Sequence, residues 1–268
     1  MNILKRSFVD SWEHLAKLWR FRSLLIALVG RHLKSRYRGS ILGFIWTLLN
    51  PLLQITIYTI VFRYYMRFGE IPNYTVFLLC GLLPWQWSVA ALAEGASAIV
   101  GNSHFVTKAL FPAQLLPASV LLTNLTNFLL SLPILLLFLF FTIGASWQIL
   151  FLPVLIFLQL LFLYGLVLLT ASLNVSFRDT QHLVGHMTMF LFFLTPIIYS
   201  AQTVPERFRG LLKINPFTIF ISSYHALLYD SAVVPLSSWA AMSALSLLFL
   251  LIGLLVFERL REGFAESL

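Results

Sequence analysis

The stretch RHLKSRYRGSILGFIWTLLNP, from Arg31 to Pro51, passes directly from a basic cluster into an unbroken apolar run. No acid lies among the cations that precede Ile41. These cations are Arg22, Arg31, Lys34, Arg36 and Arg38. Because an excess of Lys and Arg is retained on the cytoplasmic side during membrane insertion, the chain is predicted to enter its first membrane span from the cytoplasm.

The composition of the whole chain fits a membrane protein. Hydrophobic residues make up 59% and charged residues 10% of the 268 residues, whereas soluble domains are about 25% charged. At roughly 20 apolar residues per helical span, six spans leave no room for a soluble catalytic domain. The sequence therefore predicts an all-α integral membrane protein that is not an enzyme. The net charge of +8 follows from cations at the span ends, so it gives no reason to expect nucleic acid as a partner.

Apolar runs predict six transmembrane helices within one domain, 1–268. Residues 1–38 form a basic interface region, which has an amphipathic helix at 8–21 and a run at 23–30 that is too short to span. The six-span part covers 39–260, and the run at 217–228 is too short to cross, so re-entrant helices are expected on the outer side between spans 5 and 6. The predicted spans are 41–62, 74–100, 115–143, 147–173, 183–199 and 236–257.

The distribution of cations predicts the orientation. With both termini in the cytoplasm, thirteen Lys and Arg residues lie on the cytoplasmic side and five lie outside. This asymmetry favours a multi-pass protein of the cytoplasmic membrane with N- and C-termini inside.

The sequence contains no motif that would bind a metal or nucleotide, and no span carries paired acids. No cofactor is therefore expected in this chain. Glu94 is the one acid placed within a span. It could pair with a cation of the basic N-terminal region, line a conduit or couple transport to protons, and the scarcity of other buried ionisable groups counts against a proton-driven carrier.

The loop at 101–117 is predicted to be cytoplasmic and contains a short helix-like piece bounded by Pro112 and Pro117. A docking helix for a separate motor protein would have this appearance, although many cytoplasmic loops share it.

Several motifs, in order along the chain, resemble those of the permease subunits of bacterial type-2 ABC exporters of O-antigen, capsule and teichoic acid. They are YRGSILGFIWTLLNPL at 37–52, FVTKALFP at 105–112, NVSFRDT at 174–180, TPIIYS at 195–200 and NPFTIFISSYHALLYD at 215–230. The resemblance implies a homodimer of six-span subunits that docks two ATPase subunits and exports a lipid-linked polysaccharide across the bacterial inner membrane. It also implies that ATP and magnesium are bound by the ATPase partner.

Three groups of candidate site residues follow from this interpretation. The coupling site to the ATPase would comprise His104, Phe105, Thr107, Lys108 and Phe111. The entrance for a lipid diphosphate would comprise Arg31, Lys34, Arg36 and Arg38, although membrane insertion and anionic lipids account for these cations equally well. The conduit lining would include Tyr58, Trp85, Trp87, Glu94, Phe193 and Tyr199, although aromatic residues also form ordinary interfacial belts.

Three other functions remain open from the sequence. A secondary carrier would need substrate and ion sites at the membrane midplane, and the lack of paired buried charges counts against it. An ABC permease for a smaller substrate would share most of these features. A membrane-embedded transferase would need a cluster of catalytic side chains at one interface, which the sequence does not show.

Overall fold

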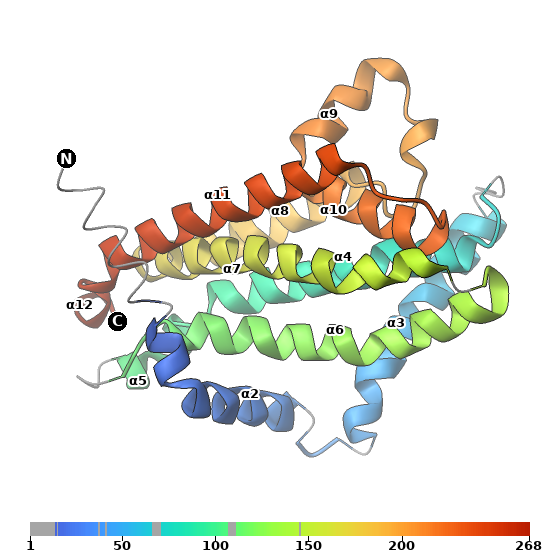
Figure 1. The fold of residues 1–268 in the computed structure, drawn as a ribbon. Coiled ribbons are helices and arrows are strands. Elements are labelled where there is room, and N and C mark those ends of the chain that lie inside the picture. Colours follow the sequence, from blue (N-terminus) through green and yellow to red (C-terminus); the bar gives the residue numbers. More distant parts are fainter. Residues whose placement is uncertain are drawn as a thin grey trace.

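The long apolar helices dominate the fold (Figure 1). The structure, a computed structural model, describes residues 14, 16–36, 38–40, 42–65, 71–106, 111–144 and 146–268, and within these ranges all regular structure is helical. Four helices of the described part are long and apolar enough to cross a membrane. They are α4 (Tyr74–Ala96), α6 (Leu115–Thr142), α7 (Leu152–Ser176, extended at its start by the 3-10 turn Trp147–Phe151) and α11 (Leu236–Arg261). The chain is thus a multi-pass membrane protein.

Shorter helices complete the bundle. α5 and α12 lie at one end, and α9 and α10 lie at the opposite end (Figure 1). The shorter helices are α2 (Arg22–Arg36), α3 (Trp46–Tyr58, continued by the π-helical turn Thr59–Tyr65), α5 (Ser103–Val106), α8 (Thr180–Leu194), α9 (Arg209–Ile214), α10 (Pro216–Tyr224, continued by the π-helical turn His225–Tyr229) and α12 (Phe264–Ser267).

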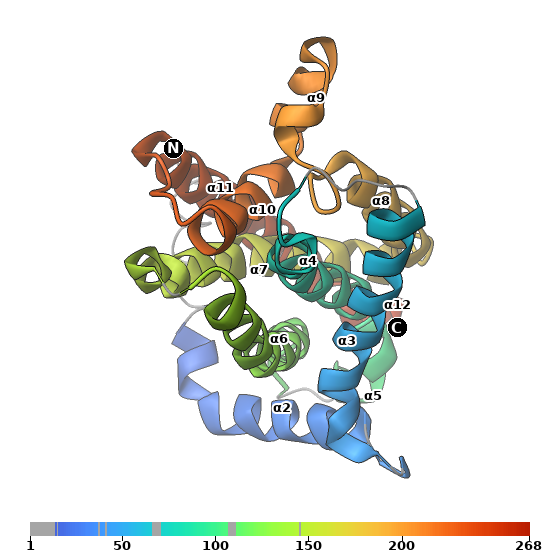
Figure 2. The ribbon, with the colours of Figure 1, turned by 90° about the vertical axis from the view of Figure 1, so that its right-hand side faces the viewer.

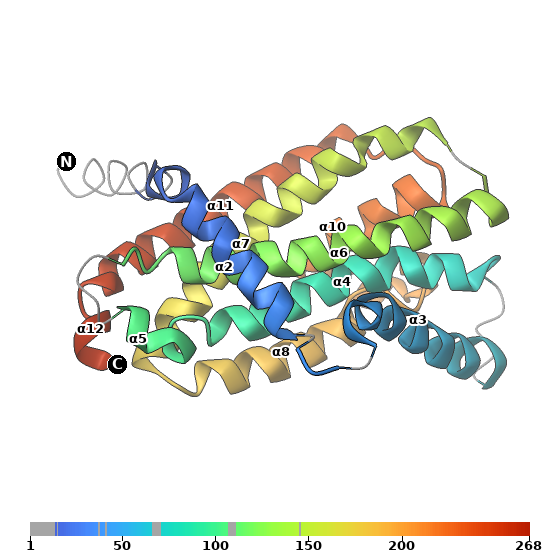
Figure 3. The ribbon, with the colours of Figure 1, turned by 90° about the horizontal axis from the view of Figure 1, so that it is seen from below.

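The structure changes the predicted boundaries most at α2, α3 and α8. The short run at 23–30 and the basic cluster form one continuous helix, α2, which crosses the face of α6 obliquely (Figure 3). Helix α3 begins at Trp46, several residues after the predicted start, because Gly43 has a φ of 50° and a 3-10 turn precedes the helix. Helix α8 ends at Leu194 because Thr195 precedes a proline and adopts an extended conformation.

The apolar run at 217–228 forms helix α10 and the π-helical turn after it. Asn215 caps the helix, since its side-chain oxygen accepts a hydrogen bond from the Phe217 backbone at 3.0 Å, and Pro216 occupies the first helical position. Phe220 is 1% exposed and stacks on Phe162 of α7 at 5.0 Å between ring centroids. The segment therefore packs inside the bundle near the end opposite α5 and α12 (Figure 1).

Helices α7 and α11 run side by side and approach closely through two glycines (Figure 1). A Cβ atom added at Gly253 would lie 2.1 Å from the carbonyl oxygen of Gly165. One added at Gly165 would lie 2.2 Å from the carbonyl oxygen of Phe249. Small residues allow this approach of backbones, which strengthens packing between membrane helices in the absence of a hydrophobic driving force.

Helix α4 lies near the centre of the bundle, between α6, α7 and α8 (Figure 2). In the most apolar 18-residue stretch of α4, 78% is buried, a larger share than in the other three long helices of the described chain. Helix α3 stands beside it at the edge of the bundle (Figure 2). The side-chain amides of Gln54 and Gln86 form a hydrogen bond that joins α3 to α4.

Candidate functional site

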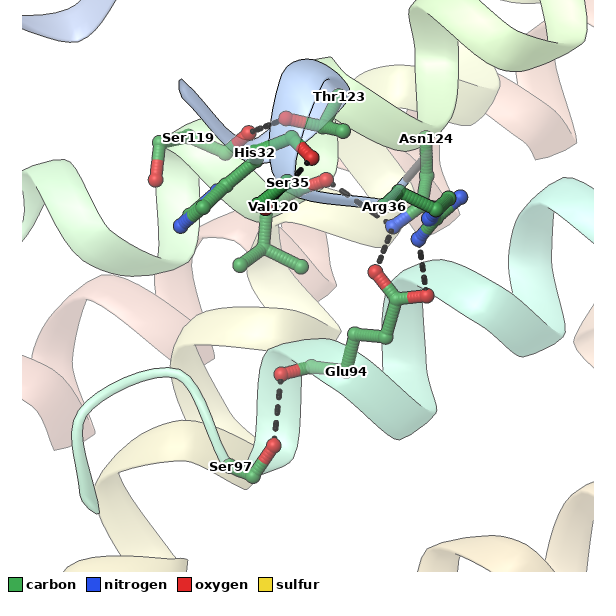
Figure 4. Close-up of polar contacts among 9 residues, drawn as sticks. All are labelled: His32, Ser35, Arg36, Glu94, Ser97, Ser119, Val120, Thr123 and Asn124. Carbon is green, nitrogen blue, oxygen red and sulfur yellow. Dashed lines mark hydrogen bonds and ion pairs between the residues drawn. The ribbon is translucent and has the colours of Figure 1, made fainter. Parts of the chain in front are cut away.

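An ion pair joins α2 to the centre of the bundle (Figure 4). Arg36 of α2 donates a hydrogen bond through Nη2 to the Glu94 carboxylate of α4. Asn124 of α6 donates through Nδ2 to the other carboxylate oxygen of Glu94 at 2.9 Å, and its Oδ1 lies 3.5 Å from Arg36 Nη2. The three side chains thus bring α2, α4 and α6 together. The structure shows the pairing of Glu94 with a cation of the N-terminal region, whereas a role in lining a conduit or in proton coupling stays a prediction.

Asn124 was not among the residues selected from the sequence. It is 2% exposed and also donates to the Val120 backbone at 3.1 Å. The sequence does contain an indication of its importance, because an asparagine within an apolar span is costly to bury and usually has a specific partner. Its partner could not be deduced, since Glu94 lies thirty positions away in the sequence.

The other members of the predicted entrance lie on α2 or in the turn after it. Arg31 and Lys34 of the helix and Arg38 of the turn line an open hollow of 680 Å³. Burial, with a smaller effect of the neighbouring Arg31 guanidinium, lowers the pKa of His32 below its usual value of 6.5 and so disfavours a positive charge on its ring. Three cations thus face one open space, an arrangement that would suit an anionic lipid headgroup.

The predicted coupling segment is a compact aromatic cluster. Phe105 of α5 stacks on Phe111 at 5.1 Å between ring centroids and contacts His104 at 4.1 Å. Both phenylalanines pack on a small apolar cluster that contains Leu116 and Val120 of α6. Thr107 and Lys108 of the predicted set lie outside the described residues.

The structure links the coupling segment to the basic helix, a connection absent from the sequence interpretation. The Arg31 guanidinium lies 5.1 Å from the centre of the Phe105 ring, and its Nη2 donates to Asn102 Oδ1 at 3.4 Å. A cation over an aromatic face is attracted by the ring quadrupole. Contacts thus run from α5 to α2 through Arg31, and from α2 to α4 and α6 through Arg36.

Two cavities flank α3, and four of the six predicted conduit residues line one or the other. The aromatic cavity, of 640 Å³, lies between α3, α4 and α8 and is lined by Tyr58, Trp85 and Phe193. Tyr199 does not line it, but its hydroxyl donates to the Phe193 carbonyl at 2.9 Å. The sequence placed these rings on three separate predicted spans, and the fold brings Tyr58, Trp85 and Phe193 to one space.

The polar cavity, of 390 Å³, lies between α3, α4 and α6 and has Arg36 and Trp87 in its wall. Trp87 is 3% exposed and stacks on Phe128 at 5.1 Å, with an interplanar angle of 9°. Glu94 lines neither of these two cavities. Trp87 and Glu94 thus lie apart from the aromatic cavity that Tyr58, Trp85 and Phe193 line.

Comparisons with known proteins identify the family. The family model described as ABC-2 type transporter matches residues 23–229. The O-antigen export system permease protein RfbA of Myxococcus xanthus is 42% identical over 255 residues, which cover 94% of this chain and 98% of that protein. A protein of the same name from Klebsiella pneumoniae is 33% identical, with 91% and 95% covered. The polysialic acid transport protein KpsM of Escherichia coli is 24% identical, with 90% and 95% covered. The chain belongs to the ABC-2 type transporter family.

Proposed function

We propose that this chain is the permease subunit of an ATP-driven exporter that moves a lipid-linked polysaccharide, such as O-antigen, across the bacterial inner membrane. The observation that carries the proposal is the 42% identity, over nearly the full length of both chains, to a protein named as an O-antigen export permease. The basic surface of α2 and the aromatic cavity supply chemistry suited to a phosphate-linked glycan. Two copies of the chain would form the conduit and dock two ATPase subunits, which bind ATP and magnesium.

The proposed topology has six crossings in a single domain, with both termini in the cytoplasm. The four long helices would cross together with α3 and α8. The 15 residues of α8 rise about 22 Å at roughly 1.5 Å per residue, less than a hydrocarbon core of about 30 Å. The extended chain after Leu194 would complete that crossing. Helix α10 would dip from the outer face and return, shielded by α4, α7 and α11.

A topology experiment tests this arrangement. Reporters placed after Leu268 and in the turn at Arg178 should be cytoplasmic. Reporters at Gly144, in the turn after α6, and at Arg209 should be extracytoplasmic. The measurement is the activity of paired reporters that are active on opposite sides of the membrane. Equal localisation of the Arg178 and Gly144 reporters would contradict the predicted crossing by α7.

The proposed coupling site is the α5 segment together with Arg31. The stacked rings of Phe105 and Phe111 hold a short cytoplasmic element against α6, and the Arg31 contact extends it to the basic helix. Force applied by an ATPase at α5 would therefore act on both α2 and α6. His104, Thr107 and Lys108 belong to the same proposed site.

Replacement of Phe105 by alanine should uncouple ATP hydrolysis from export, because it removes both the stack on Phe111 and the cation contact with Arg31. We expect about a tenfold or greater loss of export, which corresponds to about 1.4 kcal/mol, with normal amounts of protein in the membrane. Phe141→Ala is the matched control, since Phe141 is 76% exposed near the other end of α6. Export by Phe105→Ala equal to that of Phe141→Ala would exclude α5 as the coupling site.

The direct test of the proposed function is purification and reconstitution. The chain should co-purify with an ATP-hydrolysing subunit, and vesicles containing both should transport lipid-linked polysaccharide only with ATP. A chain that transports a small solute without an ATPase would support the secondary carrier instead.

A further inference from the structure

The polar cavity beside α3 is unusual for the membrane-spanning part of a protein. Its wall includes the guanidinium of Arg36 and the side-chain amides of Asn50, Gln86 and Asn127. These groups come from four different helices, so the cavity results from the tertiary fold. Polar side chains at membrane depth are costly to bury and mark functional sites by default. The volume of 390 Å³ falls within the range of about 300–1,000 Å³ that is typical of ligand sites.

Two side chains of the wall have unused hydrogen-bonding capacity. Both polar atoms of the Asn127 amide are inaccessible and have no partner within the described part of the chain. The Trp87 indole N–H is likewise without a partner among the described residues, and its side chain is 3% exposed. Asn127 lines the cavity, and the terminal torsion of asparagine is soft, so its amide is free to reorient when a ligand is present. A ligand there would satisfy groups that the protein alone leaves unpaired.

The chemistry of the wall selects the class of ligand. A side-chain amide both donates and accepts hydrogen bonds, as a sugar hydroxyl does, so amides pair well with a hydroxyl-rich group. Trp46 adds aromatic surface on which the C–H face of a sugar can pack, and Trp87 adds an unpaired indole N–H. Arg36 presents five N–H donors in a planar fork, of which Glu94 and Asn124 engage Nη2, so donors remain for a phosphate. An acyl chain would leave all of these groups unpaired.

The cavity also adjoins the aromatic cavity. Gln86 and Ala90 of α4 line both spaces, and Gln86 is hydrogen-bonded to Gln54 of α3, which lines the aromatic one. One pair of amides on α3 and α4 therefore lies between the two spaces. A headgroup bound in the polar cavity would lie next to the candidate conduit.

We propose that the polar cavity binds the headgroup of a glycosylated lipid phosphate, with Arg36 on the phosphate and the three side-chain amides on the sugar hydroxyl groups. This inference rests on the proposed export function and adds a specific site for the first sugar. A phospholipid with a hydroxylated headgroup, such as phosphatidylglycerol, offers related chemistry. The experiment therefore includes it as a separate arm.

Binding is measured by native mass spectrometry on the full chain with its ATPase subunits. The probes are polyprenyl phosphate glucose, polyprenyl phosphate and phosphatidylglycerol. The native protein should bind the glucosylated lipid about tenfold more tightly than either other lipid. Asn127→Leu should reduce this preference to less than about threefold. Arg36→Gln should weaken the binding of both polyprenyl lipids by a similar factor. Thr126→Val, the adjacent position of α6 and outside the cavity wall, is the matched control and should keep the preference.

Equal binding of the two polyprenyl lipids by the native protein would overturn the inference. Phosphatidylglycerol binding as tightly as the glucosylated lipid would identify a phospholipid site instead and would also overturn it. Asn50→Leu, on α3, repeats the test if Asn127→Leu does not fold. ATP-dependent export is measured in the same preparations. Intact export without the sugar preference refutes only the inference that the polar cavity binds the headgroup. Absence of ATP-dependent export refutes the proposed function itself.

Discussion

Replacing Gly253 by alanine is expected to force α7 and α11 apart and to deplete the folded protein from the membrane. The added Cβ would lie 2.1 Å from the carbonyl oxygen of Gly165, far inside van der Waals contact. The obstructing atom is backbone, so no side-chain rotation can relieve the clash. Overpacking a close-packed site costs about 1–3 kcal/mol and occasionally more, and we expect at least about 3 kcal/mol here because whole helices must shift.

The measurement is the melting temperature and the yield of monodisperse protein in detergent. Gly165→Ala should behave like Gly253→Ala, since its Cβ would meet the Phe249 carbonyl at 2.2 Å. Gly185→Ala on α8 is the matched control for stability, because an added Cβ there meets nothing within 4 Å. Wild-type melting of Gly253→Ala would mean that the two backbones do not touch at this point.

The long helices could be predicted from the sequence because the bilayer imposes their length. The starts of α4 at Tyr74, α6 at Leu115 and α11 at Leu236 agree with the predicted spans. Exclusion of water obliges an apolar segment of this length to form a helix and satisfy its own backbone groups. The ends are less constrained, and α4 ends at Ala96, four residues before the predicted boundary.

Helix α2 shows where this reasoning fails. Its apolar run at 23–30 is too short to span, and the cations after it suggested a junction and not a helix. The helix lies against α6, so its stability depends on tertiary contacts that no local pattern reveals.

The candidate sites were predicted as residue types but not as groupings. Cations before a first span and aromatic residues within spans are visible in one dimension. The contact of Arg31 with Phe105 and the partition of Trp85 and Trp87 between two cavities depend on helix packing across the fold. Residues two positions apart lie on nearly opposite sides of a helix, and the positions of the neighbouring helices determine which space each side faces.

Reversing the charge of Arg36 to glutamate is expected to release α2 from the bundle and abolish export. Two carboxylates would then face each other across the α2–α4 contact, and the uncharged Asn124 amide cannot compensate their repulsion. The pair is only partly buried, with side-chain exposures of 33% and 44%, so solvent screens the repulsion. We expect a coupling of about 2 kcal/mol between the two positions, within the range found for contacting residues.

The double variant Arg36→Glu with Glu94→Arg should recover much of the stability and export. It restores the opposite charges, and the Asn124 amide can turn its oxygen toward an arginine at position 94. Arg22→Glu is the matched control, because it makes the same charge change at an exposed position of α2 outside the proposed entrance. Melting temperature and export of the wild type, Arg36→Glu, Glu94→Arg and the double variant form the cycle. If Arg22→Glu is as damaging as Arg36→Glu, or if the double variant recovers nothing, the net charge of α2 and not this ion pair is what export requires.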